Sequence, residues 1–272
     1  MKDFAVIILS HGRAKDVKTY KSLRESGYTG KIIVLIDDMD EQKSLYERIY
    51  GDDVIIFDKK KRARITDSMI NSGELRSVVF ARNEANDVAK MLGYKYYAQM
   101  DDDVINFGYK CEKNGHLISR KIHRLDDVFE AIVTWMDNTK IACVGMCDPG
   151  ILFGGLNGIY KDGFGRNFNQ VVIIKTSSNI EFKGLTNQDI NAAICSNKTG
   201  KLILELYCVT HNVVKRGADG GNSDMYKDIG MYQKRFLSII ANPDCCYLND
   251  KGRIQICKKN AFPLILKGDI KK

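Results

Sequence analysis

The sequence has no hydrophobic run long enough to cross a membrane. Its longest apolar stretch, Phe4–Leu9, has six residues, whereas a spanning helix needs about 20. Lys2 and Asp3 precede this stretch, but the length and the small-residue cleavage site of a signal peptide are missing. We therefore expect a soluble, cytoplasmic protein with no membrane partner.

The sequence also lacks any C-x-x-C pair, although it contains eight cysteines. The cysteines are scattered, and several lie within apolar stretches. This spacing argues against a structural zinc site and against a disulfide framework. Reduced, buried thiols are the expectation.

No linker, repeat or low-complexity segment interrupts the 272 residues. A hydrophobic fraction of 44% supports a sizeable core, and this length suits one large α/β domain or two small ones. We expect one continuous domain over residues 1–272. The formal net charge of +8 suits a polyanionic partner such as DNA, RNA or an anionic surface, but it equally fits a basic enzyme without one.

Strand and helix patterns alternate along the first hundred residues. Continuous apolar runs predict buried strands at 4–9, 31–36, 53–57 and 94–100. Helical spacing predicts helices near 17–24 and 45–50 and over 75–92, and a polar stretch occupies 58–74. Repeated βα units predict an α/β fold with a mostly parallel sheet and helices on both faces.

The second half has a less regular order of elements. Strands are predicted at 141–146, 169–176 and 202–209, and helices at 125–136, 187–196 and 226–240. A glycine-rich segment occupies 150–165, and the tail, 247–266, reads as a hairpin of short strands.

Three polar clusters follow predicted strands: Ser10–Arg13, Asp37-Asp38 and Asp101–Asp103. Ligands of parallel α/β sheets bind beyond the carboxyl ends of the strands, so we expect these clusters to form one site. Asp101 and Asp103 point the same way on an extended chain, and Asp102 points to the other side. Closely packed carboxylates suit Mg²⁺ or Mn²⁺, which commonly shares its coordination with a substrate diphosphate.

The motif Ala81-Arg82-Asn83, followed by Gly93-Tyr94 and by a strand closed by Asp101-Asp102-Asp103, resembles the GT-A glycosyltransferases. The resemblance covers roughly residues 4–230. Within that superfamily the chain looks most like the phage and bacterial TET-associated glycosyltransferases, which act on hydroxymethylated pyrimidines in DNA. The resemblance implies a Rossmann-like GT-A fold, a nucleotide-sugar-binding half at 1–104 and an acceptor-binding half at 105–272.

The resemblance also implies a metal site. Asp103 is the expected metal ligand, and Asp101 is expected to contact the ribose or the metal. His211 completes the metal shell in the family pattern, although an ordinary strand-end histidine is an equal alternative. The cofactor would be Mn²⁺ or Mg²⁺, and the donor substrate a UDP-sugar.

The residues expected around the donor are Ser10, Arg13, Asp37, Arg82, Asp101, Asp102, Gly220 and Gly221. Asp37 would accept a hydrogen bond from uracil N3–H or, alternatively, cap the next helix. Arg82 would touch the donor or brace the aspartates, and a structural salt bridge is the other possibility. Gly220 and Gly221 would hold the diphosphate on backbone amides or form a simple turn.

On the acceptor side, the resemblance implies a glycine-rich loop that contains Gly154, Gly155 and Asn157. Asn187-Gln188-Asp189 resembles the family's x-E-D motif, with Gln where Glu is usual. Asp189 alone can accept a proton from an attacking hydroxyl. It would be the general base of an inverting reaction, would position the substrate in a retaining one, and otherwise would simply begin a helix.

A basic group, formed by Lys59, Lys60, Lys61, Arg62 and Arg64, lies in the polar stretch. It would contact the DNA backbone or form a solvated loop over the donor. The function expected overall is metal-dependent sugar transfer to the hydroxymethyl group of a modified pyrimidine, 5-hydroxymethylcytosine, in phage DNA. The alternatives are a glycan, lipid carrier or protein acceptor, a sugar-phosphate nucleotidyltransferase, and a non-catalytic DNA-binding module.

Overall fold

The computed structural model describes residues 1–70, 73–148, 170–214, 225, 228, 231–251 and 254–256. Its first half contains β1 (Phe4–Leu9), α1 (Lys18–Glu25), β2 (Lys31–Asp37), α2 (Lys43–Tyr50), a 3-10 turn (Gly51–Asp53), β3 (Val54–Phe57), α3 (Lys59–Ile65), α4 (Val79–Met91) and β4 (Tyr96–Asp101). The remainder contains β5 (Val104–Lys113), β6 (His116–Lys121), α5 (Leu125–Asp137), β7 (Ile141–Cys147), β8 (Val171–Lys175), a 3-10 turn (Thr176–Ser178), α6 (Gln188–Lys198), β9 (Leu202–Val213), α8 (Met231–Ala241), β10 (Cys246–Leu248) and β11 (Ile254–Ile256).

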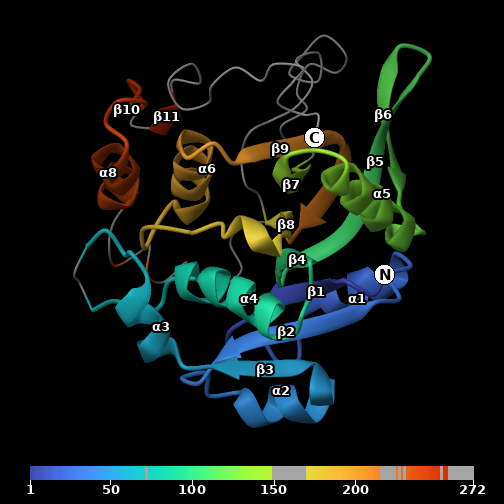
Figure 1. The fold of residues 1–272 in the computed structure, drawn as a ribbon, viewed down its shortest axis with the longest axis horizontal. Helices are drawn as coiled ribbons and strands as arrows, with labels where there is room; N and C mark the ends of the chain where they lie inside the picture. The colour runs from blue at the N-terminus through green and yellow to red at the C-terminus, as the bar shows by residue number, and fades with distance from the viewer. Residues whose placement is uncertain are drawn as a thin grey trace.

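Nine strands form one sheet in the order β3-β2-β1-β4-β8-β7-β9-β5-β6 (Figure 1). The pairing directions make β3, β2, β1, β4, β7, β9 and β6 run one way and β8 and β5 the other. The prediction of a mostly parallel sheet is therefore confirmed, with two reversed strands. β10 and β11 form the separate antiparallel hairpin expected in the tail.

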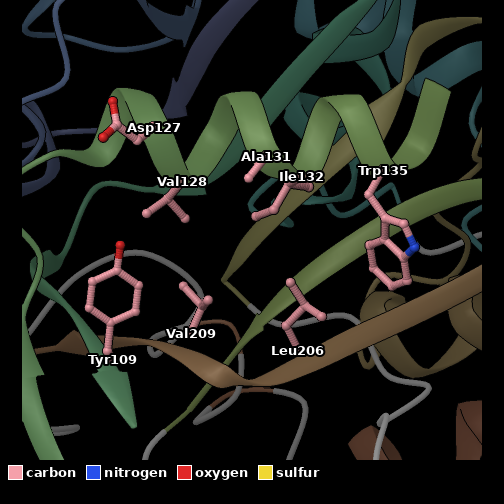
Figure 2. Close-up of a pocket in the computed structure, with 8 residues that line it drawn as sticks. All are labelled: Tyr109, Asp127, Val128, Ala131, Ile132, Trp135, Leu206 and Val209. Atoms are coloured by element: carbon pink, nitrogen blue, oxygen red, sulfur yellow. The ribbon is translucent and has the colours of Figure 1, made fainter. Parts of the chain in front are cut away.

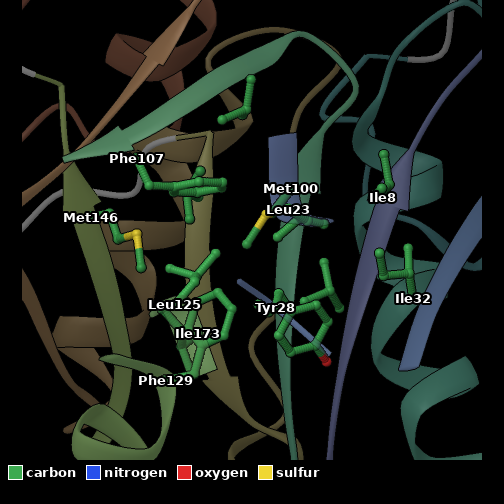
Figure 3. Close-up of a cluster of buried hydrophobic side chains, with 14 of the residues drawn as sticks. Ile8, Leu23, Tyr28, Ile32, Met100, Phe107, Leu125, Phe129, Met146 and Ile173 are labelled. Carbon is green, nitrogen blue, oxygen red and sulfur yellow. The ribbon is translucent and has the colours of Figure 1, made fainter. Parts of the chain in front are cut away.

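The sheet is covered on both faces because its central strands are apolar on both sides. All six residues of β1 are buried, as expected for a strand inside a parallel sheet. Its residues alternate between two cores: Phe4, Val6 and Ile8 pack with α1, α2 and α5, whereas Ala5, Ile7 and Leu9 pack with α4 and α6. Figure 3 shows the first core, where Ile8, Met100 and Ile173 of the sheet face Leu23 and Phe129 of the helices.

Two observed parts of the fold, α3 and the β5–β6 hairpin, differ from the sequence prediction. The polar stretch after β3 contains the helix α3, because the Asp58 carboxylate accepts the Lys61 backbone N–H at 2.8 Å and caps its start. The β5–β6 hairpin was not predicted at all; its turn, Asn114-Gly115, has φ of 53° and 76°, the left-handed geometry of a two-residue hairpin turn.

Gly27 ends α1 in the left-handed region, at φ 84°. A Cβ at this position would lie 2.2 Å from the carbonyl oxygen of His123, so the close approach of these segments requires glycine. Within the described ranges, no helix combines the length and apolarity needed to cross a bilayer.

Candidate active site

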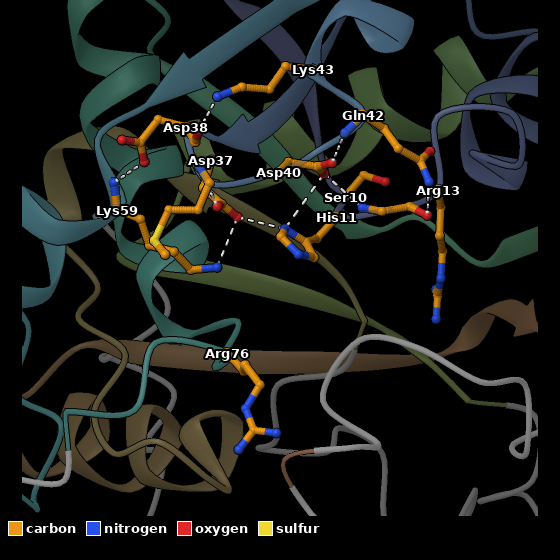
Figure 4. A network of polar contacts seen from close by, with 12 residues as sticks. Ser10, His11, Arg13, Asp37, Asp38, Asp40, Gln42, Lys43, Lys59 and Arg76 are labelled. Atoms are coloured by element: carbon orange, nitrogen blue, oxygen red, sulfur yellow. Dashed lines mark hydrogen bonds and ion pairs between the residues drawn. The ribbon is translucent and has the colours of Figure 1, made fainter.

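Polar residues gather where β1, β2 and β4 end side by side. Leu9 at the end of β1 is in register with Leu35 on β2 and with Asp101 on β4. Ser10, Asp37 and the three aspartates therefore follow neighbouring strand ends, as predicted, and Figure 4 shows the part of this edge formed by β1, β2 and β3. The arrangement matches the ligand-binding edge of an open α/β sheet.

Asp102 is tied to the loop after β1. Its carboxylate accepts hydrogen bonds from the Ser10 hydroxyl and from Arg13 Nη1, both at 2.7 Å. Tyr46 of α2 joins them, because its hydroxyl lies 2.7 Å from that of Ser10 and accepts the Arg13 backbone N–H at 2.9 Å. Burial raises the pKa of Asp102, although Arg13 and Ser10 favour its charged form. Its contacts give Asp102 the role of fixing this loop.

Asp101 faces the other side, toward α4. Arg82 is 5% exposed and donates from Nη2 to Asp101 Oδ1 at 2.9 Å; its guanidinium also lies over the Phe182 ring, 5.5 Å from the centroid. Burial raises the pKa of Asp101 to about 6 against the lowering effect of Arg82. The ion pair of Arg82 with Asp101 fits both the predicted brace of the aspartates and the predicted structural salt bridge, and contact of Arg82 with the donor stays a prediction.

Asp103 has an unused carboxylate oxygen. Its Oδ1 atom is buried and has no hydrogen-bond partner within the described part of the chain, and burial together with the charge of Asp102 raises its pKa. A nearby cation would give Oδ1 a partner and would stabilise the charged form of Asp103. Mg²⁺ or Mn²⁺ is commonly held by one or two carboxylates plus substrate phosphates, so Asp103 and Asp101 fit such an ion.

The described residues contain no group of three or more His, Cys, Asp or Glu side chains arranged to hold a metal. His211 lies inside β9 rather than after a strand, is 1% exposed, and places Nε2 3.1 Å from Gln170 Oε1. Burial lowers its pKa to about 4, so the imidazole is neutral. Gln170 also accepts the Asp101 backbone N–H at 3.2 Å on its carbonyl, which connects His211 to the aspartates through one residue. Metal ligation by His211 stays a prediction.

Asp37 is enclosed by Lys59 and His11 (Figure 4). Its Oδ2 atom accepts Lys59 Nζ at 3.0 Å and His11 Nδ1 at 2.9 Å, and Oδ1 accepts the Met39 backbone N–H at 3.1 Å. Burial opposes its ionisation, but His11 and Lys59 lower the pKa of Asp37 overall. Asp37 does not cap α2; it has three of about four acceptor positions filled, so contact with a nucleobase would use the last.

The five cations of the basic group have different surroundings. Lys59 is 8% exposed and pairs with Asp37, and Arg62 pairs with Glu84 at 2.5 Å and with Asp87 at 2.6 Å. These ion pairs occupy Lys59 and Arg62, and the group lies in the helix α3 rather than in the predicted loop. Lys60, Lys61 and Arg64 remain exposed, and their role in DNA binding stays a prediction.

Asp189 lies in the first turn of α6, close enough to Asp101 that its charge raises the pKa of that residue. It has no hydrogen-bond or ion-pair partner among the described residues. Gln188 beside it is 6% exposed, and its Oε1 finds no partner in the same part of the chain. The carboxylate of Asp189 is therefore near Asp101 and is available to accept a proton or to bind a ligand.

The predicted residues Gly154, Gly155, Asn157, Gly220 and Gly221 lie outside the described residues. Sequence reasoning missed Tyr46 and Gln170, which support the aspartates. Tyr46 lies in a predicted helix, but nothing in the local pattern marks its hydroxyl as part of the site. Gln170 gives no signal in the sequence, because its contacts come from strands far apart along the chain.

An apolar cavity of about 280 Å³ lies between α5 and the strands β5 and β9 (Figure 2). Val128, Ile132 and Trp135 line it from the helix, and Tyr109, Leu206 and Val209 line it from the strands. Its single carboxylate, Asp127, pairs with Arg124 at 2.8 Å. The cavity shares no residue with the polar strand ends and lacks a set of groups for catalysis.

Comparison with known proteins identifies a family. The family model of the TET-associated glycosyltransferases matches residues 4–221, which is more than half of the chain. No curated protein sequence matches this chain.

Solved structures share the fold at low identity. S. aureus TarS 1–349 in complex with UDP-GlcNAc has a TM-score of 0.52 and 14% identity, covering 88% of this chain and 66% of that one. A mycobacterial protein has a TM-score of 0.50 and 9% identity, covering 97% of this chain and 84% of that one. These likenesses show the fold alone.

Proposed function

Because this chain belongs to the TET-associated glycosyltransferase family, it is a glycosyltransferase, and we propose that it moves a sugar from a UDP-sugar to the hydroxymethyl group of a modified pyrimidine in DNA. The observation that carries the proposal is the unpartnered oxygen of Asp103 beside the Arg82–Asp101 pair, at the sheet edge that binds ligands. TarS, which shares the fold, is solved with UDP-GlcNAc, and this supports a nucleotide-sugar donor.

Asp103 and Asp101 would hold Mg²⁺ or Mn²⁺. Such an ion, when bound, neutralises the charge that develops on a diphosphate leaving group. Arg82 keeps Asp101 in place through a charge-assisted hydrogen bond. Ser10 and Arg13 hold Asp102, so the loop between β1 and α1 keeps a fixed position against the aspartates.

Asp189 would act on the acceptor. In an inverting transfer, the hydroxymethyl oxygen attacks the anomeric carbon, the bond from that carbon to the diphosphate breaks, and the hydroxyl proton moves to the Asp189 carboxylate. A base stacked inside a duplex would not reach this position, so the modified pyrimidine would leave the stack before transfer.

The test is a mass analysis of nucleosides digested from DNA that contains 5-hydroxymethylcytosine, after incubation with the protein, Mn²⁺ and a panel of UDP-sugars. We expect the mass of one added sugar with the wild-type protein and none with Asp103→Asn. Asp103→Asn should keep the wild-type melting temperature, because its Oδ1 has no partner to lose.

Asp102→Asn is the matched control. It weakens the pairing with Arg13 and Ser10, so, unlike Asp103→Asn, it should lower the melting temperature, and it should reduce product formation rather than abolish it. UDP release without a DNA product would remove the DNA acceptor from the proposal, and full activity of Asp103→Asn would remove the metal role.

A further inference from the structure

The β5–β6 hairpin extends beyond the rest of the sheet (Figure 1). β5 pairs with β9 only as far as Tyr109, whereas its pairing with β6 continues to Lys113 opposite His116. Within the part of the chain that the structure describes, residues 110–119 therefore pair with each other and with no third strand. We call residues 110–121 the basic arm.

The basic arm carries exposed cations that form no ion pair with any described residue. It contains Lys110, Lys113, Arg120 and Lys121 but a single acidic residue, Glu112. Lys113, Arg120 and Lys121 are exposed and form no ion pair within the described ranges. In α3, by contrast, Lys59 forms an ion pair with Asp37 and Arg62 forms one with Glu84.

The dimensions of the arm suit the major groove of duplex DNA. The ladder from the Tyr109–Arg120 pair to the Lys113–His116 pair spans four residue steps, or about 13 Å at about 3.3 Å per residue. The major groove is about 8.5 Å deep and about 12 Å wide and admits a two-stranded β-ribbon. Alternation along the strands places Arg120 and Lys113 on one face of the ribbon. Lys121 lies on the other face with Leu117, which packs against Cys147 and Tyr207, so the face of Arg120 and Lys113 is the one that would meet a groove.

We propose that the basic arm lies in the major groove of the DNA acceptor and contacts its phosphates. This rests on the proposed function and specifies how its acceptor is held. The arm is continuous with the active site, because β5 begins at Val104, directly after Asp103. Tyr109, at the base of the arm, is six residues from Asp103, and Lys113, near its tip, is ten residues away, or at most about 20 Å and about 33 Å along an extended strand. One turn of duplex DNA is about 34 Å long, so a duplex on the arm spans the distance to the aspartates.

The test compares the triple variant Lys113→Ala, Arg120→Ala and Lys121→Ala with a control that removes equal charge elsewhere, Lys2→Ala, Lys21→Ala and Lys90→Ala. The control residues are also exposed. Binding of a labelled 5-hydroxymethylcytosine duplex is measured by fluorescence anisotropy from about 50 to about 200 mM salt. Loss of three phosphate contacts should reduce the slope of log K against log salt by about 2.7 and, relative to 1 M salt, weaken binding by roughly 500-fold near 0.1 M salt.

The control should keep the wild-type slope. An unchanged slope in the arm variant would overturn the proposal, and so would equal losses in the arm variant and in the control. Equal binding of single strands or of anionic lipid vesicles would overturn the fit to a duplex groove.

Free 5-hydroxymethyldeoxycytidine, offered as acceptor with a UDP-sugar, separates this inference from the proposed function. All variants should glycosylate the nucleoside at the wild-type rate if the arm only holds DNA. A wild-type protein that modifies neither nucleoside nor DNA contradicts the proposed function, while the salt slopes still decide whether the arm binds DNA.

Discussion

Asp101, Asp102 and Asp103 are consecutive, yet each contacts a different part of the molecule. Asp101 pairs with Arg82 on one side of the sheet, and Asp102 accepts hydrogen bonds from the loop after β1 on the other. Asp103 retains an oxygen without a partner in the described structure. Side-chain alternation along an extended chain thus separates Asp102, which holds the loop, from Asp101 and Asp103, which would share a ligand.

The His11–Asp37 pair predicts a pH-dependent contribution to stability. The hydrogen bond to Asp37 raises the pKa of His11 above 6.5, with a smaller contribution from Asp40, while burial and Lys59 oppose the shift. This contribution is present below about pH 6.5 and is lost as the pH rises through the folded-state pKa. Asp37, whose pKa is lowered from 3.8, contributes above about pH 4 and loses its contribution at lower pH.

The melting temperature of His11→Gln should therefore fall furthest below that of the wild type between about pH 4 and pH 6.5 and approach it above about pH 8. Calorimetry across this range checks the prediction. Asp40→Asn tests the smaller effect and should give a shallower pH dependence. A constant difference between wild type and His11→Gln at all pH values would show that the pair makes no ionic contribution.

Residues that act together at the site could be predicted where they follow strands in sequence. Ser10, Asp37 and Asp101–Asp103 were found this way, because parallel strands place their carboxyl ends at one edge. The pairing of Lys59 with Asp37 could not be predicted, because it joins positions 22 residues apart. Local sequence marks Lys59 as one of several exposed cations, and only the packing of β2 against β3 buries it.

At the scale of elements, strands and helices with strong apolar patterns were predicted within a few residues. The hairpin was missed because its residues are mostly polar, although Asn114-Gly115 is the typical signal of a two-residue turn. The helix α3 was missed because its many charged residues give no apolar helical pattern, so Asp58 was not recognised as a helix cap. Tertiary pairing also lengthens β9 to Val213, since Phe107 and Val104 of β5 supply partners beyond the apolar run.

Asn83 predicts how α4 is held to the segment before α6. Its Nδ2 donates to the Phe182 carbonyl and its Oδ1 accepts the Phe182 N–H, both at 2.9 Å. Asn83→Ala leaves both backbone groups without these partners, so we expect a loss of about 2 kcal/mol of unfolding free energy. Urea denaturation measures the loss.

Asn83→Asp is the control for this prediction. It keeps the acceptor for the Phe182 N–H but cannot donate to the carbonyl, so its stability should lie between those of the wild type and Asn83→Ala. Equal stability of Asn83→Ala and the wild type would show that solvent replaces both hydrogen bonds without cost.

At the scale of the whole molecule, one sheet carries both the strands of the expected donor half and those of the expected acceptor half. β4 of the first half pairs with β8 along five residues, and each face of β1 belongs to a core that includes residues from beyond position 104. The sheet is therefore continuous where the two halves meet, between β4 and β8. The expectation of a single domain over residues 1–272 therefore becomes a prediction about cooperativity.

Ile7→Ala in the centre of β1 should destabilise the whole described fold in one transition. Ile7 is fully buried, and such a substitution costs about 2–5 kcal/mol. The single tryptophan of the chain, Trp135, lies on α5 in the other half and packs against the opposite core. Because the sheet joins the two cores, the urea midpoint reported by Trp135 fluorescence should shift by the same amount as the midpoint reported by far-UV circular dichroism. A fluorescence midpoint that stays at its wild-type value while the circular dichroism transition moves or splits would mean that the two halves unfold as separate units.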